Sequence, residues 1–106
     1  MYTKEIAQLC GEAYYEVLKI LNGAKGDVYS DASYRFPFRC LMLLYPRAIK
    51  IGATKTLDEK MGELMNLISP DDIKDLMEKP IQQSMILYYE IGRNKHLEKR
   101  KANERN

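Results

Sequence analysis

The sequence of 106 residues predicts an all-α fold, a compact bundle of about five helices. Apolar residues recur at spacings of three and four along most of the chain, which places them on one face of a helix. Helix starts are marked by capping side chains and early carboxylates, and no segment alternates apolar and polar residues for long enough to form a strand. At this length we expect a single domain over residues 1–106, of which 97–106 form a flexible basic tail.

The first predicted helix runs from Thr3 to Leu21. Asn22 and Gly23 end it, because both residues tolerate the left-handed conformation that closes helices. Its apolar and polar residues are expected to lie on opposite sides. The apolar side consists of Ile6, Leu9, Cys10, Ala13, Val17, Ile20 and Leu21, and the polar side of Glu5, Glu12, Glu16 and Lys19.

The second predicted helix follows a loop over residues 23–33 and begins close to Ser33, whose hydroxyl can cap the first amides. Pro37 is tolerated in the first turn of a helix. Pro46 removes a hydrogen bond and clashes with the carbonyl group four residues earlier. We therefore expect a kink or a break near Met42 to Tyr45, which would divide this helix into two short ones.

Three further helices complete the predicted bundle. After a loop over residues 52–55, Thr56 and Glu59 have the spacing of a capping box and predict the start of the third helix. Ser69 and Pro70 precede two carboxylates, which predicts the start of a short fourth helix. The fifth runs from about Pro80 and extends into residues 93–101, with Met85, Tyr88, Tyr89 and Gly92 on its apolar side.

Composition and cysteine usage indicate the compartment. Cys10 and Cys40 do not form a metal-binding motif and have apolar neighbours, so we interpret them as reduced core thiols and not as a disulfide. This interpretation favours a cytoplasmic protein. Lys4 and Glu5 interrupt any signal peptide, and the longest apolar run, residues 40–45, is too short to cross a bilayer. We expect no membrane partner.

Charge is unevenly distributed along the chain. The sequence has 17 Lys and Arg against 15 Asp and Glu, a nearly neutral total that favours no partner by itself. The apolar segment from Arg35 to Gly52 nevertheless contains four cations and no carboxylate, residues 57–79 are acidic, and the chain turns basic again from Arg93. One explanation is that the aliphatic parts of these Lys and Arg side chains cover apolar surface while their charged ends stay in water. Arg35 and Arg39 are four residues apart and are predicted to share a helical face, and Arg47 and Lys50 are three residues apart. Like charges at these spacings destabilise a helix slightly unless an anion such as a phosphate neutralises them. The predicted nucleic-acid-binding residues are Arg35, Arg39, Arg47, Lys50, Lys55 and Arg93.

Catalytic chemistry has little support in the sequence. His96 is the only histidine, so no histidine pair is available for catalysis or for a metal ion. Asp71, Asp72 and Asp75 are explained by their position at a helix start. The segment 52–56 contains a Lys-Thr pair but lacks the glycine before the lysine that a phosphate loop requires. We therefore predict a protein that is not an enzyme and has no metal site and no cofactor.

The order of several motifs resembles a known family. These are the stretches Tyr14-Tyr15-Glu16-Val17-Leu18 and Tyr29-Ser30-Asp31-Ala32-Ser33, then Pro37 with the helix that carries Arg39 and Arg47, then Met61-Gly62-Glu63-Leu64-Met65, Gln82-Gln83-Ser84-Met85 and the pair Tyr88-Tyr89. In this order, over about residues 9–93, they are similar to the small subunit of CRISPR type I effector (Cascade) complexes, in particular type I-C. In that type the small subunit corresponds to the C-terminal region of the large subunit.

The resemblance implies a non-catalytic helical bundle within a ribonucleoprotein that serves antiviral defence. Copies of the subunit would pack on one another and on other Cascade subunits. They would steady the guide RNA, the target DNA or the displaced DNA strand through backbone contacts, and Arg39 and Arg47, with Arg35 and Lys50 by proximity, would contact phosphates. The alternative is a helical adaptor that binds only protein, or a phage-borne mimic of such a subunit.

Overall fold

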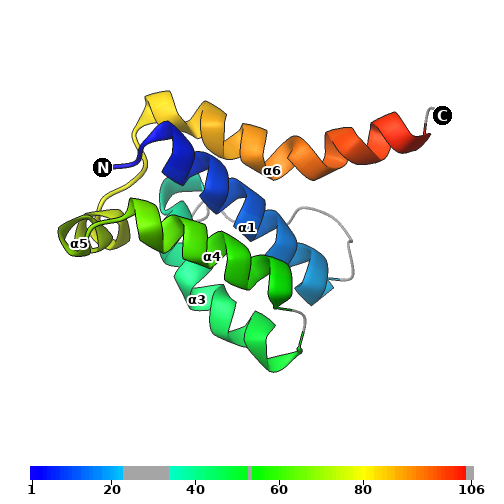
Figure 1. The fold of residues 1–106 in the computed structure, drawn as a ribbon. Helices are drawn as coiled ribbons and strands as arrows, with labels where there is room; N and C mark the ends of the chain where they lie inside the picture. The colour runs from blue at the N-terminus through cyan, green and yellow to red at the C-terminus, as the bar shows by residue number, and fades with distance from the viewer. Residues whose placement is uncertain (23–33, 53, 105–106) are drawn as a thin grey trace.

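The computed structural model describes residues 1–22, 34–52 and 54–104, with residues 22 and 95–104 described by their backbone alone. Five helices account for most of these residues, and no strand is found among them, which confirms the predicted all-α bundle. Helix α1 lies between α6 on one side and the pair α3 and α4 on the other, while α5 lies at one end of the bundle (Figure 1). The bounds are α1 Lys4–Asn22, α3 Pro37–Lys50, α4 Lys55–Leu67, α5 Pro70–Glu78 and α6 Gln83–Glu104.

Helix α1 is the centre of the core. Thr3 precedes it, and the Thr3 hydroxyl accepts a hydrogen bond from the amide of Ile6 at 3.2 Å. Ile6, Cys10, Ala13 and Val17 of the predicted apolar side are all buried, as the spacing predicts. Tyr14 is buried as well, because helices cover α1 on more than one side. Gly23, which was predicted to end this helix, lies outside the described residues.

Helix α3 differs from the prediction at its start and in its middle. It begins at Pro37, with Phe36 in the capping position, and Ser33 lies outside the described residues. The predicted break is wrong, because one continuous helix includes Pro46. Pro46 lies on the exposed side, where the carbonyl group that lost its partner can bind water.

Helices α4 and α5 test two predicted caps. Helix α4 begins at Lys55, so Thr56 lies inside its first turn and the predicted capping box is wrong. The capping position is occupied by Thr54, whose side chain makes no capping hydrogen bond. The predicted cap of α5 is confirmed, because Ser69 Oγ accepts a hydrogen bond from the amide of Asp72 at 3.3 Å.

Helix α6 begins at Gln83, three residues later than Pro80, because the connection before it is bonded to other elements. The amide of Ile81 donates a hydrogen bond to the carbonyl oxygen of Arg35 at 2.7 Å. The side-chain amide of Gln82 donates one to the carbonyl oxygen of Tyr2 at 2.6 Å. The helix then continues through Glu104, across residues 97–104 of the predicted basic tail, and its second half extends beyond the bundle (Figure 1). Within the described residues, no helix has the length and apolar character needed to cross a membrane.

Candidate nucleic-acid interface

Three of the six predicted site residues lie together on the exposed side of α3. Arg39, Arg47 and Lys50 are all exposed. At 3.6 residues per turn they lie within about 80° of one another around the helix axis, spread over about 16 Å of its length. The opposite side of α3 packs into the core through the buried residues Pro37, Phe38, Leu41 and Ala48. Packing of this apolar side therefore directs the three cations outward.

Among the described residues, no carboxylate neutralises the charges of these three side chains. None of the three forms an ion pair with any carboxylate in the described part of the chain. The Arg39 guanidinium lies over the ring of Phe36, 5.9 Å from its centroid, which is a cation–π contact and leaves the charge in place. The exposed side of α3 is thus a source of positive potential.

The helix itself accounts for only part of this pattern. Arg47 and Lys50 lie in the last turn of α3, where the helix dipole favours cations. Arg39 is the third residue of the helix, close to its positive end, and the first turn contains no acidic residue. A cation in that position is disfavoured by about 0.3 to 1 kcal/mol. The helix dipole therefore does not account for the cation at Arg39.

The other three predicted residues lie elsewhere. Arg35 is exposed but precedes α3, so the prediction that it shares a helical face with Arg39 is wrong. Lys55 is the exposed first residue of α4 and lines, together with Lys19, a hollow of about 470 Å³. Arg93 is 9% exposed, and its Nη1 donates to the hydroxyl of Tyr34 at 3.1 Å. Its guanidinium therefore lies in the interior, apart from the cations of α3.

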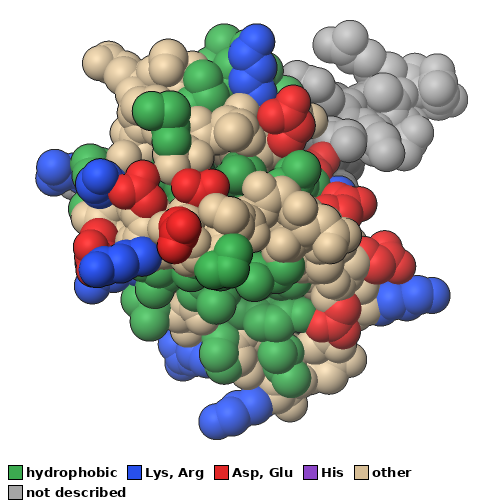
Figure 2. Space-filling view, turned by 60° about the vertical axis from the view of Figure 1, so that its left-hand side comes forward, with side chains coloured by type: hydrophobic (Ala, Val, Ile, Leu, Met, Phe, Trp, Pro, Cys, Tyr) green, Lys and Arg blue, Asp and Glu red, His purple; other side chains and the backbone are tan. Residues whose placement is uncertain are grey.

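Exposed apolar side chains accompany the cations of α3. Leu43 is 66% exposed and lies four residues from both Arg39 and Arg47, so these three form a row along the helix, here called the α3 ridge. Figure 2 shows hydrophobic side chains gathered over the lower half of one face, with Lys and Arg at their lower margin and Asp and Glu above and beside them. Other exposed large apolar residues of α3 and the turn after it are Met42, Ile49 and Ile51. The sequence predicted the cations but not this apolar exposure, because apolar residues occur on every side of the helix from Cys40 to Tyr45.

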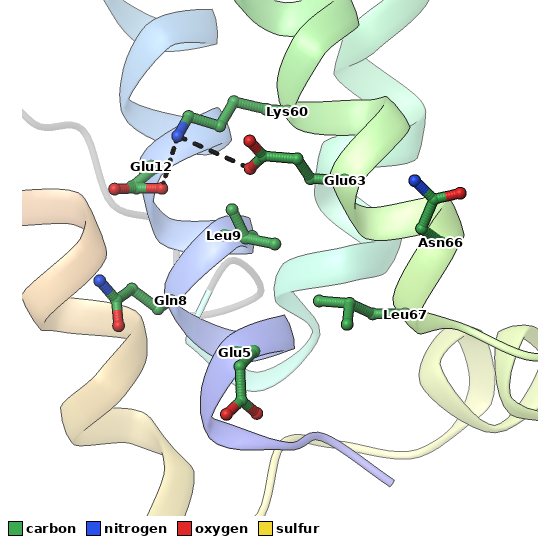
Figure 3. Close-up of a pocket in the computed structure, with 8 residues that line it drawn as sticks. All are labelled: Glu5, Gln8, Leu9, Glu12, Lys60, Glu63, Asn66 and Leu67. Carbon is green, nitrogen blue, oxygen red and sulfur yellow. Dashed lines mark hydrogen bonds and ion pairs between the residues drawn. The ribbon is translucent and has the colours of Figure 1, made fainter.

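A second surface feature is a groove of about 590 Å³ between α1 and α4 (Figure 3). Leu9 and Leu67 lie in its middle, Glu5 lies at one end, and Glu63 lies at the other end beside Glu12 and Lys60. Gln8 and Asn66 complete its lining. This set of eight residues is called the acidic groove, since three carboxylates face one ammonium group.

Glu12 corrects the predicted polar side of the first helix. It is 2% exposed, and its carboxylate accepts a hydrogen bond from Lys60 Nζ at 2.9 Å. Lys60 also lies 3.9 Å from Glu63. The prediction placed Glu12 with the solvent-facing charges, whereas α4 covers it. No local signal in the sequence identifies this pair, because the two residues are 48 positions apart.

The described residues contain few groups suited to catalysis. Cys10 is fully buried, and burial raises the pKa of its thiol well above its usual value, so the thiol is protonated. Cys40 is also a free thiol with a pKa raised by burial, an effect that Arg39 partly opposes. No group of three or more potential metal-ligating side chains lies together in this part of the chain. Asp72 and Asp75, from the predicted helix start, instead lie close to the amino group of Met1.

Comparison with known proteins gives no relative. No family model, no curated protein and no solved structure matches the chain.

Proposed function

We propose that this protein is a non-catalytic subunit of a cytoplasmic CRISPR RNA-guided complex, and that it contacts the sugar-phosphate backbone of RNA or DNA through α3. The observation that carries the proposal is the exposed group Arg39, Arg47 and Lys50, which has no described carboxylate paired with it. Arg is well suited to phosphates, because its planar group of donors can bind two of their oxygens at once. The resemblance of the motif order to the Cascade small subunit supports the choice of complex.

Recognition of this kind would be independent of base sequence. The α3 cations are spread over about 16 Å of one helix, a length suited to following a backbone. Phosphate contacts position a protein on nucleic acid and contain no sequence information. The subunit would therefore stabilise guide RNA, target DNA or displaced DNA within the complex, and pairing by the guide would supply the specificity.

A second candidate function is that of a helical adaptor that binds only protein. The observation in its favour is the exposure of Leu43 and Ile49, 66% and 48%, on the same helix as the cations. Apolar side chains at the centre of a surface patch are typical of protein interfaces. In a multi-subunit particle the two functions are compatible, since other subunits or further copies of the chain would cover such residues.

The experiment that separates the candidates measures binding of the purified protein to a fluorescent single-stranded oligonucleotide and to a duplex across a series of salt concentrations. We expect Arg39→Glu/Arg47→Glu to weaken binding at least about tenfold and to lower the salt dependence by about 1.4 in log–log slope for a single strand. The matched control is Lys4→Glu/Lys74→Glu, which reverses two exposed cations outside α3 and should leave binding within about twofold.

Circular dichroism of both variants establishes that they remain helical. A wild-type protein that does not bind, or that binds with no dependence on salt, would favour the protein adaptor. Equal losses in the α3 variant and in the control would show that only net charge matters, and would remove α3 as the interface.

A further inference from the structure

The acidic groove between α1 and α4 has charged ends and an apolar middle. Glu5 and Glu63 lie at its opposite ends, and Leu9 and Leu67 lie between them (Figure 3). Leu67 is 47% exposed and Leu9 is half-buried, so a ligand can cover both leucines further. Each end carboxylate lies four residues, about 6 Å along the helix axis, from the leucine of its own helix. A complementary ligand therefore has two positive charges separated by an aliphatic segment.

The lining residues of the groove have an excess of negative charge. They contribute three carboxylates and one ammonium group, which gives a net charge of −2. The ammonium group of Lys60 lies 2.9 Å from Glu12 and 3.9 Å from Glu63, so its closer partner is the buried Glu12. The Glu63 side chain is 57% accessible. Glu5 is exposed and forms no ion pair with a cation in the described part of the chain. A cationic ligand can therefore reach both end carboxylates.

Two amide side chains complete the groove, Gln8 from α1 and Asn66 from α4. An amide oxygen accepts hydrogen bonds from an ammonium group without adding charge. The volume of the groove, about 590 Å³, is within the range of small-molecule sites. Because the leucines hold Glu5 and Glu63 apart, the two carboxylates do not converge on one point as the ligands of a metal ion do. The lining therefore suits an extended organic cation better than a compact one.

We propose that the acidic groove binds an aliphatic polyamine, with its terminal ammonium groups at Glu5 and Glu63 and its methylene chain over Leu9 and Leu67. Aliphatic amines are protonated at neutral pH, as lysine side chains are. Exposed ion pairs alone are weak, so affinity also requires the burial of methylene groups against the leucines. The groove shares no residue with the α3 cations, and this inference is independent of the proposed function.

Titration of the protein, free of nucleic acid, with spermidine tests the proposal, with backbone amide resonances followed by NMR. At about 50 mM NaCl we expect a Kd of about 1 mM or tighter, with the largest shifts at groove residues of α1 and α4. Glu5→Gln/Glu63→Gln, which neutralises both ends of the groove, should weaken binding at least about tenfold. The matched control is Glu59→Gln/Glu78→Gln, which removes two exposed carboxylates outside the groove and should leave the Kd within about twofold.

Two further ligands separate the contributions of charge and of the methylene chain. Mg²⁺ has two charges and no apolar part, and n-butylamine has one charge and a short chain, so both should bind at least about tenfold more weakly than spermidine. Equal affinity for Mg²⁺ and spermidine would mean that the groove attracts cations only through its net charge, and would overturn the proposal. Shifts centred outside the groove, or a groove variant that binds like the control, would also overturn it. The groove variant retains all α3 cations, so its binding to the oligonucleotide tests the proposed function separately.

Discussion

The backbone of Gly92 on α6 lies directly against the backbone of Gln8 on α1. A Cβ atom at Gly92 would lie 2.0 Å from the carbonyl oxygen of Gln8, and one at Gly11 would lie 2.0 Å from the carbonyl oxygen of Tyr89. Two glycines, one on each helix, thus allow α1 and α6 to approach to backbone contact. Among the described helices, α1 makes the most extensive contact with α6, so this crossing attaches α6 to the bundle.

Replacement of Gly92 by Ala is expected to destabilise the protein by about 3 kcal/mol, because a backbone atom cannot move aside as a flexible side chain can. For a domain of this size that corresponds to a decrease of roughly 15 °C in Tm, measurable by circular dichroism. The matched control is Gly62→Ala on α4, where a Cβ meets nothing within 4 Å. There the better helix propensity of Ala should stabilise the protein by about 0.5 to 1 kcal/mol. Equal stability of Gly92→Ala and the wild type would contradict the close crossing.

The ion pair between Glu12 and Lys60 should show strong coupling in unfolding experiments. The side chain of Glu12 is 3% exposed and that of Lys60 is 20% exposed, so solvent screens this pair weakly. Lys60→Met removes the ammonium group from a buried carboxylate and should cost about 3 kcal/mol. Glu12→Gln/Lys60→Met should cost less than the sum of the two single changes, by about 1 kcal/mol or more.

Urea unfolding of the four proteins in this cycle provides the measurement. The control is Lys74→Met, since Lys74 is exposed on α5 and its replacement should change the free energy of unfolding by no more than about 0.5 kcal/mol. Additive effects of the Glu12 and Lys60 substitutions would mean that the pair does not form in solution.

The hydroxyl group of Tyr2 joins two helices to the start of the chain. It accepts a hydrogen bond from the amide of Phe38 at 3.0 Å and donates one to the carbonyl oxygen of Leu76 at 3.4 Å. Tyr2→Phe leaves the buried amide of Phe38 without this acceptor, which should cost about 1 to 3 kcal/mol. Thermal unfolding followed by circular dichroism measures this loss of stability. The control is Tyr88→Phe, in which the half-buried ring keeps its contact with Lys4, and this change should lower the free energy of unfolding by no more than about 0.5 kcal/mol.

Local patterns in the sequence predicted the helices and much of the core, but not the contacts between distant elements. The apolar spacing of the first helix identified Ile6, Cys10, Ala13 and Val17 as buried, because one face of an amphipathic helix packs whatever covers it. Glu12 was misplaced, because its burial depends on α4, which is far along the chain. The close approach at Gly92 likewise depends on the partner helix and not on its neighbours in sequence.

The candidate interface was predicted in part for the same reason. Arg39, Arg47 and Lys50 could be identified because they lie on one helix, where spacing alone determines the shared face. Arg35 was assigned to that face on the assumption that the helix begins near Ser33, whereas it begins at Pro37. Arg93 was selected by charge, and its burial against Tyr34 depends on tertiary structure.

The two predicted helix caps should respond differently to substitution by Ala. Ser69→Ala removes the oxygen that accepts from the amide of Asp72, and should destabilise the protein by about 1 kcal/mol. Thr56→Ala changes an exposed residue inside the first turn of α4, where Ala is a better helix former, and should be neutral or slightly stabilising. Thermal unfolding of both variants under the same conditions measures the difference. A loss at Thr56 as large as that at Ser69 would mean that α4 starts with the capping box after all.

Tyr45 on α3 donates a hydrogen bond to the carboxylate of Asp58 on α4, and this contact should be visible in the dependence of stability on pH. Burial, followed by the hydrogen bond and the negative charge of Asp58, raises the pKa of Tyr45 from 10.0 to about 12. Because the pKa in the folded protein exceeds that of the unfolded chain, the contribution of Tyr45 to stability is complete below pH 10 and is lost as the pH rises toward 12.

Titration of the tyrosine ring carbons by NMR should therefore show a resonance with this late midpoint, absent from Tyr45→Phe and shifted to lower pH in Asp58→Asn. Urea unfolding between pH 9 and 11 should show a smaller decline for Tyr45→Phe than for the wild type, because that variant cannot release this proton. If Asp58→Asn leaves the midpoint of Tyr45 unchanged, the Asp58 carboxylate does not accept a hydrogen bond from the Tyr45 hydroxyl. The two side chains would then not be in contact in solution.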